Sequence, residues 1–293
     1  MTKEEKKELV FFLRIRGGSA AAMLAKRCEP CYNRTNLYKR KSARKKDCMS
    51  NITNMIAEGK GKRLYATENP DQAVVYYRDE TFAFHGLKRG RIIGKGEINN
   101  LICEHVFTLL TEKGVPNHFI KRIDNRCSLV KRVQMIPFVV KVRNIAAGSL
   151  ARRMGVPDGT HLRNTVIEFN LKNTEMEDAM VNVTHITAMD LATPEEVRLM
   201  EKMSCRVNEI LTECMNDISI ELIDFRLEFG RYHGEIVLAD EVSPDTCRFW
   251  DAATHEPMDL DRFRHDLGDV AEAYRDVLHR LTGNVLKNTE EDM

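Results

Sequence analysis

IDFRLEFGRYHGEIVLADEVSPDTCRFWD, residues 223–251, begins with apolar residues at every second position. Side chains alternate between the two faces of a β-strand, so this run predicts a strand with one apolar face and one polar face. Gly230 and Gly234 bracket a polar segment, and a second short run, Glu235–Asp240, follows it. The stretch therefore predicts a β-hairpin with a longer loop, whose apolar face belongs to the core.

Acidic residues stand out on the polar face of this hairpin. Glu228 and Asp240 have the same parity, so an unbulged register with an even pairing sum places both carboxylates on one face. Asp224 and Arg226 share that face. Two carboxylates from neighbouring strands suit Mg²⁺, which binds one or two carboxylates together with waters and substrate phosphates. The alternative is a solvated polar face, the commoner outcome for charges on a strand.

A loop with an arginine follows the hairpin. Ser243-Pro244-Asp245 precedes Arg248 by a few residues, in a segment without helical periodicity. The guanidinium group is suited to bidentate capture of a phosphate or a carboxylate. Acids for a metal ion beside a basic loop for an anion indicate a phosphoryl-transfer site.

A glycine-lysine segment is a second candidate for phosphate binding. Glu58–Tyr65 reads EGKGKRLY, and its glycines would let the backbone approach a phosphate while Lys60 and Lys62 supply positive charge. The segment lacks the Walker pattern, and an ordinary turn is the alternative interpretation.

A third candidate lies in Arg143–Gly155, which reads RNIAAGSLARRMG. The pattern places an arginine at the end of a strand, then a tight turn, and then a short helix that Ser149 opens. The free N–H groups at a helix start attract anions. Alternatively, Ser149 only caps its helix and Arg143 lies on the surface.

Hydrophobic periodicity predicts the remaining elements. Strands are predicted at 72–78, 118–123, 128–133 and 138–142. Helices are predicted at 97–113, 194–216 and 262–281. The second helix follows a capping box at Thr193 and has a proline in its first turn. Strands thus cluster in the first part of the chain and mix with helices afterwards.

The composition is that of a globular protein, with 43% hydrophobic and 30% charged residues in a chain of 293. The chain has no run of about 18 apolar residues, so no membrane-spanning helix is predicted. The 8 cysteines are scattered, which favours a reducing compartment. Residues 1–50 hold 14 Lys and Arg against 5 Asp and Glu, although the whole chain has a net charge of +1. This basic segment predicts a solvated tail, with contact to nucleic acid or an anionic surface as the alternative, and its lone pair Cys28 and Cys31 is a weak zinc signal.

Several motifs resemble those of the SAICAR synthetase (phosphoribosylaminoimidazole-succinocarboxamide synthetase) family: DFRLEFG, VLADEVSPDTCRFWD and DRFRHDLG. Matching motifs occur in order from about Glu58 to Leu281. The resemblance implies an α+β fold with two lobes, similar to kinases and ATP-grasp proteins. A smaller N-terminal lobe with an antiparallel sheet would span 55–136, a larger C-terminal α/β lobe 137–284, and ATP would bind in the cleft. Residues 1–54 would be a basic, flexible extension and 285–293 a polar tail.

The resemblance also implies a reaction of de novo purine biosynthesis. ATP, L-aspartate and carboxyaminoimidazole ribonucleotide (CAIR) would give SAICAR, ADP and phosphate. A carboxylate is a poor acylating agent, so ATP would first form an acyl phosphate, from which the aspartate amine displaces phosphate. Such a route depends on positioning and charge neutralisation more than on a nucleophilic side chain. The family further implies Mg²⁺, a cytoplasmic homo-oligomer, and no nucleic-acid or membrane partner.

Residue roles at the ATP site follow from the resemblance. Lys60 and Lys62 would contact the ATP phosphates, and Met135 would line the adenine pocket. Glu228 and Asp240 would hold the Mg²⁺ that bridges those phosphates.

Further roles follow on the substrate side. Arg143, Ser149 and Arg248 would hold the 5′-phosphate of the ribonucleotide. Asp245 and Asp178 would also belong to the substrate site.

Three residues are candidates for the reaction centre itself: Asp224, Arg226 and Lys172. The sequence departs from the family's pattern at four positions: His85, Val139, Thr174 and Arg226. Arg226 stands where a lysine is typical, and because arginine stays protonated its role would be limited to charge pairing. Two alternatives stay open: a small-molecule kinase on the same scaffold, which needs no aspartate, and a non-catalytic paralogue, which the departures favour.

Overall fold

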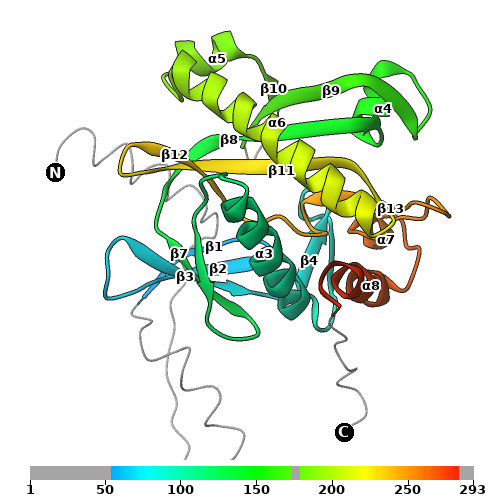
Figure 1. Cartoon of the computed structure of the whole chain (residues 1–293), viewed down its shortest axis with the longest axis horizontal. Helices are drawn as coiled ribbons and strands as arrows, with labels where there is room; N and C mark the ends of the chain where they lie inside the picture. The colour runs from blue at the N-terminus through cyan, green and yellow to red at the C-terminus, as the bar shows by residue number, and fades with distance from the viewer. Residues whose placement is uncertain (1–53, 173–178, 284–293) are drawn as a thin grey trace, which may run out of the picture. The chain divides into compact units, whose positions relative to one another are not determined.

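The run at residues 223–229 lies in the middle of a six-stranded antiparallel sheet (Figure 1). The computed structural model describes residues 54–172 and 179–283. The strand order is β10-β9-β8-β11-β12, and β13 also pairs with β11. The strands are β8 (Gln134–Ala146), β9 (Thr160–Leu171), β10 (Met180–Val181), β11 (Ile220–Tyr232), β12 (Glu235–Ala239) and β13 (Cys247–Asp251).

The alternation predicted for β11 is confirmed for Phe225, Leu227 and Phe229, which share one core cluster, whereas Ile223 belongs to a separate cluster next to an irregularity in the strand. Four alternating side chains are each at most 1% exposed: Ile223, Phe225, Leu227 and Phe229. The helix α6 (Pro194–Asp217) packs on β11 and β8, and its apolar side joins three of these residues in one cluster. Burying a large apolar side chain contributes roughly 1.5–3 kcal/mol, so this face stabilises the whole sheet.

The turn of the hairpin is shorter than predicted. Tyr232 pairs with Glu235, so only His233 and Gly234 form the turn. Both have positive φ, at 50° and 85°. Two residues in the left-handed conformation match the twist of the flanking strands. The prediction of a longer loop was therefore wrong.

The predicted loop was too long because Gly230 does not bracket it. The predicted pairing register was a second error. Gly230 lies inside β11, where a methyl group would come 2.5 Å from Cγ2 of Val133, so glycine permits a close approach there. The even register was also wrong, because Glu228 pairs with Ala239. Asp240 follows the last residue of β12 and has a φ of 64°, so it departs from the alternation of the strand.

A second antiparallel sheet precedes this one in the chain, with the order β1-β2-β3-β7-β6. Its strands are β1 (Met55–Glu58), β2 (Lys62–Ala66), β3 (Gln72–Tyr77), β6 (Phe119–Arg122) and β7 (Cys127–Lys131). A separate ladder and a 3₁₀ turn complete this part: β4 (Glu80–Ala83), β5 (Lys88–Arg91) and η1 (Phe84–Gly86). The strands predicted near 72–78, 118–123 and 128–133 are confirmed as β3, β6 and β7.

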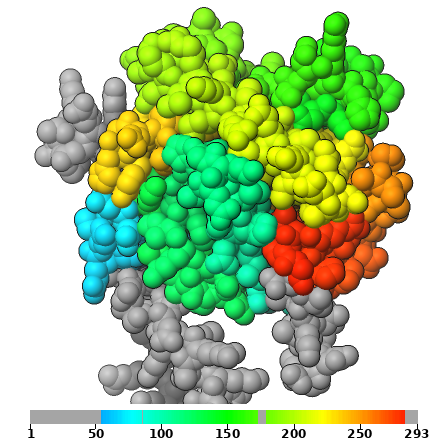
Figure 2. Space-filling model, viewed as in Figure 1, coloured from blue at the N-terminus to red at the C-terminus, as the bar shows by residue number. Residues whose placement is uncertain are grey.

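The helix α3 (Lys95–Glu112) packs on the second sheet and against α8 (Val270–Thr282), and the two helices meet at the surface in Figure 2. Its inward side chains are buried: Ile98, Ile102, Val106 and Leu110. Gly114, with a φ of 78°, follows the helix as predicted.

The single C-terminal helix predicted at 262–281 was wrong. The chain forms a short α7 (Asp261–Arg264), then a break, then α8. Asp266, Gly268 and Asp269 all have positive φ, which a right-handed helix does not accommodate. Nε of Arg262 donates to the carbonyl of Gly268 at 2.9 Å, which holds the break in place.

The remaining helices follow their sequence signals. The capping box before α6 is confirmed, because Thr193 Oγ1 accepts from the Glu196 amide while the Glu196 carboxylate accepts from the Thr193 amide. Two short helices accompany β9 and β10: α4 (Ser149–Met154) and α5 (Val183–Ala188).

Backbone hydrogen bonds join the two sheets. The Leu238 amide of β12 donates to the carbonyl of Pro116 at 3.0 Å, and the His118 amide donates to the Leu238 carbonyl at 2.8 Å. His118 in turn accepts from the Lys131 amide of β7. The expected α+β fold with two lobes is confirmed: each lobe is built on its own antiparallel sheet.

Within residues 54–172 and 179–283, no helix is both long and apolar enough to cross a membrane. The basic extension with Cys28 and Cys31, the polar tail, Thr174 and Asp178 lie outside the described residues.

Candidate active site

Lys62 joins the two lobes at the start of β2. Its ammonium nitrogen lies 2.5 Å from Asp240 Oδ1 and 3.0 Å from Glu241 Oε1. The preceding glycine segment is held by the Gly59 amide, which donates to the Lys62 carbonyl, and by the Arg78 amide, which donates to the Gly61 carbonyl, both at 2.8 Å. The glycine-lysine segment therefore faces the carboxylates that follow β12.

The pKa values of this group reflect strong pairing. Burial alone would lower the pKa of Lys62, but Asp240 and Glu241 raise it well above its usual range. Burial would raise the pKa of Asp240, yet the ammonium of Lys62 brings it down to about 2. Both groups are therefore charged at neutral pH.

Glu228 forms an ion pair with Lys172, which follows β9 directly. Lys172 is placed by its own amide, which donates to the carbonyl of Pro137 at 3.1 Å. Lys172 and Arg226 also contribute to the lowered pKa of Asp240. The carboxylates of Glu228 and Asp240 thus interact with the same two cations, Lys62 and Lys172.

This arrangement suits a divalent cation that has both carboxylates as ligands. No cluster of three or more His, Cys, Asp or Glu suited to a metal ion occurs among residues 54–172 and 179–283. Glu228 and Asp240 supply two carboxylates, which is the number that Mg²⁺ takes when phosphates and waters complete its coordination. In the protein alone, Lys172 and Lys62 neutralise those carboxylates.

Arg143 is the centre of a second cluster on β8. It is only 4% exposed, and its three nitrogens donate to Glu168 Oε2 at 2.8 Å, Asp224 Oδ2 at 3.0 Å and Ser149 Oγ at 3.1 Å. The alternative interpretation of this motif is therefore wrong in both of its parts: Arg143 is buried, and the N-cap of α4 is Gly148, with no side-chain cap.

Arg248 of β13 reaches the same cluster from the other side of Asp224. It donates to the Asp224 carboxylate and, at 2.6 Å, to Asp261 Oδ2. A methyl group on Gly148 would lie 3.0 Å from Nη2 of Arg248, so the backbone passes close to the guanidinium. Burial would lower the pKa of Arg248, but Asp224 and Asp261 raise it. Arg143, Ser149 and Arg248 are therefore gathered around one small region.

The other predicted residues lie as follows. Lys60 is exposed, and Met135 is 39% exposed near the start of β8. Val139 is buried and pairs with Glu228 across the ladder. Both carboxylate oxygens of Asp245 accept hydrogen bonds from within the protein, from Lys95 and Tyr274.

Several site residues were not found from the sequence: Glu241, Glu168, Asp261, Lys95 and Tyr274. Glu241 directly follows Asp240, so adjacency to a predicted ligand was an available signal. The partners of the others are distant in the chain; 150 residues separate Lys95 from Asp245. No local pattern encodes such pairs.

The fold and the two clusters define a two-lobed protein with two groups of paired charged side chains along β11, one at Asp224 and one at Glu228. The sequence profile of the SAICAR synthetase family matches residues 55–281, and the chain belongs to that family.

Individual relatives agree with this assignment. The phosphoribosylaminoimidazole-succinocarboxamide synthase of Persephonella marina is 51% identical over 226 residues, which is 77% of this chain and 95% of that protein. The crystal structure of the Ehrlichia chaffeensis synthase superposes with a TM-score of 0.77 at 40% identity, covering 80% of this chain and all of that one. A SAICAR synthetase solved in complex with ADP gives a TM-score of 0.77 at 39% identity, again over 80% of this chain and all of the other.

Proposed function

We propose that the chain catalyses the ATP-dependent ligation of L-aspartate to CAIR, giving SAICAR, ADP and phosphate in de novo purine biosynthesis. The observation that carries the proposal is the pair of clusters on one strand of a SAICAR synthetase fold. Asp224 and Glu228 are four residues apart on the same face of β11, which corresponds to about 13 Å. One cluster would bind the phosphate of the ribonucleotide, and the other would bind ATP.

At the ATP end, Lys60 and Lys62 would bind the phosphates, and Met135 would border the adenine. Glu228 and Asp240 would hold Mg²⁺, whose charge offsets that of the phosphates as they react. The ammonium of Lys62 lies 2.5 Å from Asp240 and 3.0 Å from Glu241, so on binding ATP it would turn from a carboxylate toward a phosphate. The ion pair that Lys62 loses with a carboxylate would then be replaced by one with a phosphate.

At the ribonucleotide end, Arg143, Ser149 and Arg248 would hold the 5′-phosphate. Asp224 accepts from both arginines, while Glu168 accepts from Arg143 and Asp261 from Arg248, so both guanidinium groups are held in fixed directions. Guanidinium groups held in this way are preorganised for an anion.

The reaction itself would proceed in two displacements. A carboxylate oxygen of CAIR attacks the γ-phosphorus of ATP, and the bond from that phosphorus to ADP breaks. The aspartate amine then attacks the acyl carbon, phosphate leaves, and the nitrogen loses a proton. Lys172 and Arg226 would neutralise the charge that develops between the two clusters, and Arg226 cannot act as a base because arginine stays protonated.

We also propose that the protein works in the cytoplasm as a homo-oligomer with L-aspartate as its amine substrate. Asp178, which lies outside the described residues, stays a candidate for the substrate site.

The test is ADP release by the full chain with ATP, Mg²⁺, CAIR and aspartate, omitting each in turn. The proposal requires all four, with SAICAR as product. ADP formed equally well without aspartate would favour a small-molecule kinase. Binding of ATP without any turnover would favour a non-catalytic paralogue.

A further inference from the structure

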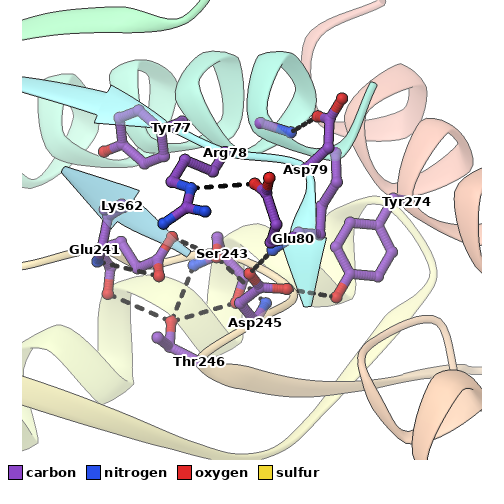
Figure 3. Close-up of polar contacts among 12 residues, drawn as sticks. Lys62, Tyr77, Arg78, Asp79, Glu80, Glu241, Ser243, Asp245, Thr246 and Tyr274 are labelled. Atoms are coloured by element: carbon purple, nitrogen blue, oxygen red, sulfur yellow. Dashed lines mark hydrogen bonds and ion pairs between the residues drawn. The ribbon is translucent and has the colours of Figure 1, made fainter. Parts of the chain in front are cut away.

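Asp245 lies in the loop between β12 and β13, and both of its carboxylate oxygens are engaged by other parts of the chain (Figure 3). Nζ of Lys95, at the start of α3, donates to Oδ2 at 2.5 Å, and the Tyr274 hydroxyl of α8 donates to Oδ1 at 2.6 Å. Lys95 is 1% exposed and Tyr274 is fully buried. Burying a charged side chain without such a partner is costly, so the contact with Asp245 matters for the fold.

The glycine-lysine segment passes close to the trio formed by Lys95, Asp245 and Tyr274. A methyl group on Gly61 would lie 3.6 Å from Nζ of Lys95 and 3.7 Å from Oδ2 of Asp245, which is ordinary contact distance. The next residue is Lys62, which pairs with Asp240 and Glu241. The segment therefore pairs with the loop between β12 and β13 through Lys62, and at Gly61 it passes Asp245 with room for about one methyl group between them.

The loop between β12 and β13, residues 240–246, is held together by its own hydrogen bonds, as Figure 3 shows. Ser243 Oγ donates to Glu241 Oε2 at 3.1 Å and accepts from the Asp245 amide at 3.2 Å. The Ser243 amide donates to Thr246 Oγ1, also at 3.1 Å. Arg248 follows directly in β13. Fixing Asp245 therefore also restrains Ser243 and Glu241, and Arg248 lies three residues further along the chain.

Electrostatics agree with this geometry. Burial would raise the pKa of Asp245, but the ammonium of Lys95 and the hydrogen bonds from Lys95 and Tyr274 lower it. The carboxylate is thus charged and fully occupied by internal partners.

We infer that Lys95, Asp245 and Tyr274 are positioning residues that set the spacing between the ATP end and the ribonucleotide end of the site. This inference rests on the proposed function for its catalytic consequence. Asp245 then acts through the loop, in place of the direct contact with substrate that the sequence suggested. Because a small misplacement of reacting groups costs orders of magnitude in rate, the trio affects kcat more than binding of either ligand.

The test uses the full chain with Tyr274→Phe, which keeps the ring in its packing and removes only the hydroxyl. We expect kcat to fall about 10-fold or more, while the KM values for ATP and CAIR stay within about threefold. Tyr232→Phe at the hairpin tip is the matched control and leaves kcat unchanged. Normal kcat in Tyr274→Phe would overturn the inference. So would a rise in the KM for CAIR or aspartate of tenfold or more in Asp245→Asn with kcat retained, because that result assigns Asp245 to the substrate.

A second readout does not depend on ligase activity. Hydrogen exchange of the backbone amides at 59–62 and 243–247 reports whether the two segments are held. Tyr274→Phe is expected to speed exchange in both segments, and Tyr232→Phe in neither. Faster exchange confined to α8 would contradict the inference even if the proposed function holds. Faster exchange in both segments of a protein that makes no SAICAR would support the positioning role and refute only the function.

Discussion

Arg248→Lys tests the ribonucleotide end of the site. Arg248 donates through two nitrogens, to Asp224 and Asp261, and by our account it also holds a phosphate oxygen. A lysine supplies one ammonium group that cannot span these partners. A charge-assisted hydrogen bond is worth roughly 1.5–3 kcal/mol, and about 1.4 kcal/mol corresponds to a tenfold change in affinity. The KM for CAIR is therefore expected to rise roughly 10- to 100-fold.

Steady-state kinetics with each substrate varied in turn measure this effect. The KM for ATP should stay within about threefold, because Arg248 does not reach the Lys62 group. Arg280→Lys is a matched control, since Arg280 also bridges two carboxylates, Asp251 and Asp276, but lies outside the site. An unchanged KM for CAIR in Arg248→Lys, or an equal rise in both KM values, would refute the reasoning.

Three further predictions concern the metal acids and the hairpin. Glu228→Ala should abolish turnover while circular dichroism and the melting temperature show a folded protein; activity like that of the wild type would remove Glu228 from the metal site. The pKa of Asp240 is held to about 2 in the folded chain, below its unfolded value near 3.9. Its contribution to stability is therefore present above about pH 4 and lost as the pH falls toward 2, so urea titrations of Asp240→Asn should show a flatter decline over that window than the wild type. Gly230→Ala should lower the free energy of unfolding by about 1–3 kcal/mol through the clash with Val133; the added change Val133→Ala should recover part of this loss, and no recovery would point to another cause.

The local pattern of β11 was sufficient to predict the centre of the fold. Alternation requires only that one face be buried, and Phe225 and Phe229 satisfy it. The pattern could not tell a turn glycine from a packing glycine. Gly234 lies in the turn with positive φ, whereas Gly230 leaves space for the Val133 side chain, and the sequence alone does not distinguish the two roles.

The prediction of one continuous helix at 262–281 failed for a different reason. Residues 262–281 keep helical periodicity, and Gly268 is the only glycine among them. Asp266 and Asp269 also adopt the left-handed conformation, which aspartate does without a distinctive sequence signal. Tertiary contacts, such as the bond from Arg262 to the Gly268 carbonyl, decide where the helix breaks.

The candidate site was predictable where its residues lie in compact motifs. The motifs around Arg143, Glu228 and Arg248 each carry several candidate side chains within a few positions. The ion pairs that organise them join distant segments: Glu168 is 25 residues from Arg143, and Asp240 is 178 residues from Lys62. Such pairings depend on sheet order, which local periodicity does not specify.

Isotope transfer tests the central claim most directly. CAIR labelled with ¹⁸O in both carboxylate oxygens is incubated with the full chain, ATP, Mg²⁺ and aspartate, and the released phosphate is analysed by mass spectrometry. If a carboxylate oxygen attacks the γ-phosphorus and leaves with phosphate, each phosphate carries one ¹⁸O atom. Unlabelled phosphate released together with SAICAR would contradict the acyl-phosphate route.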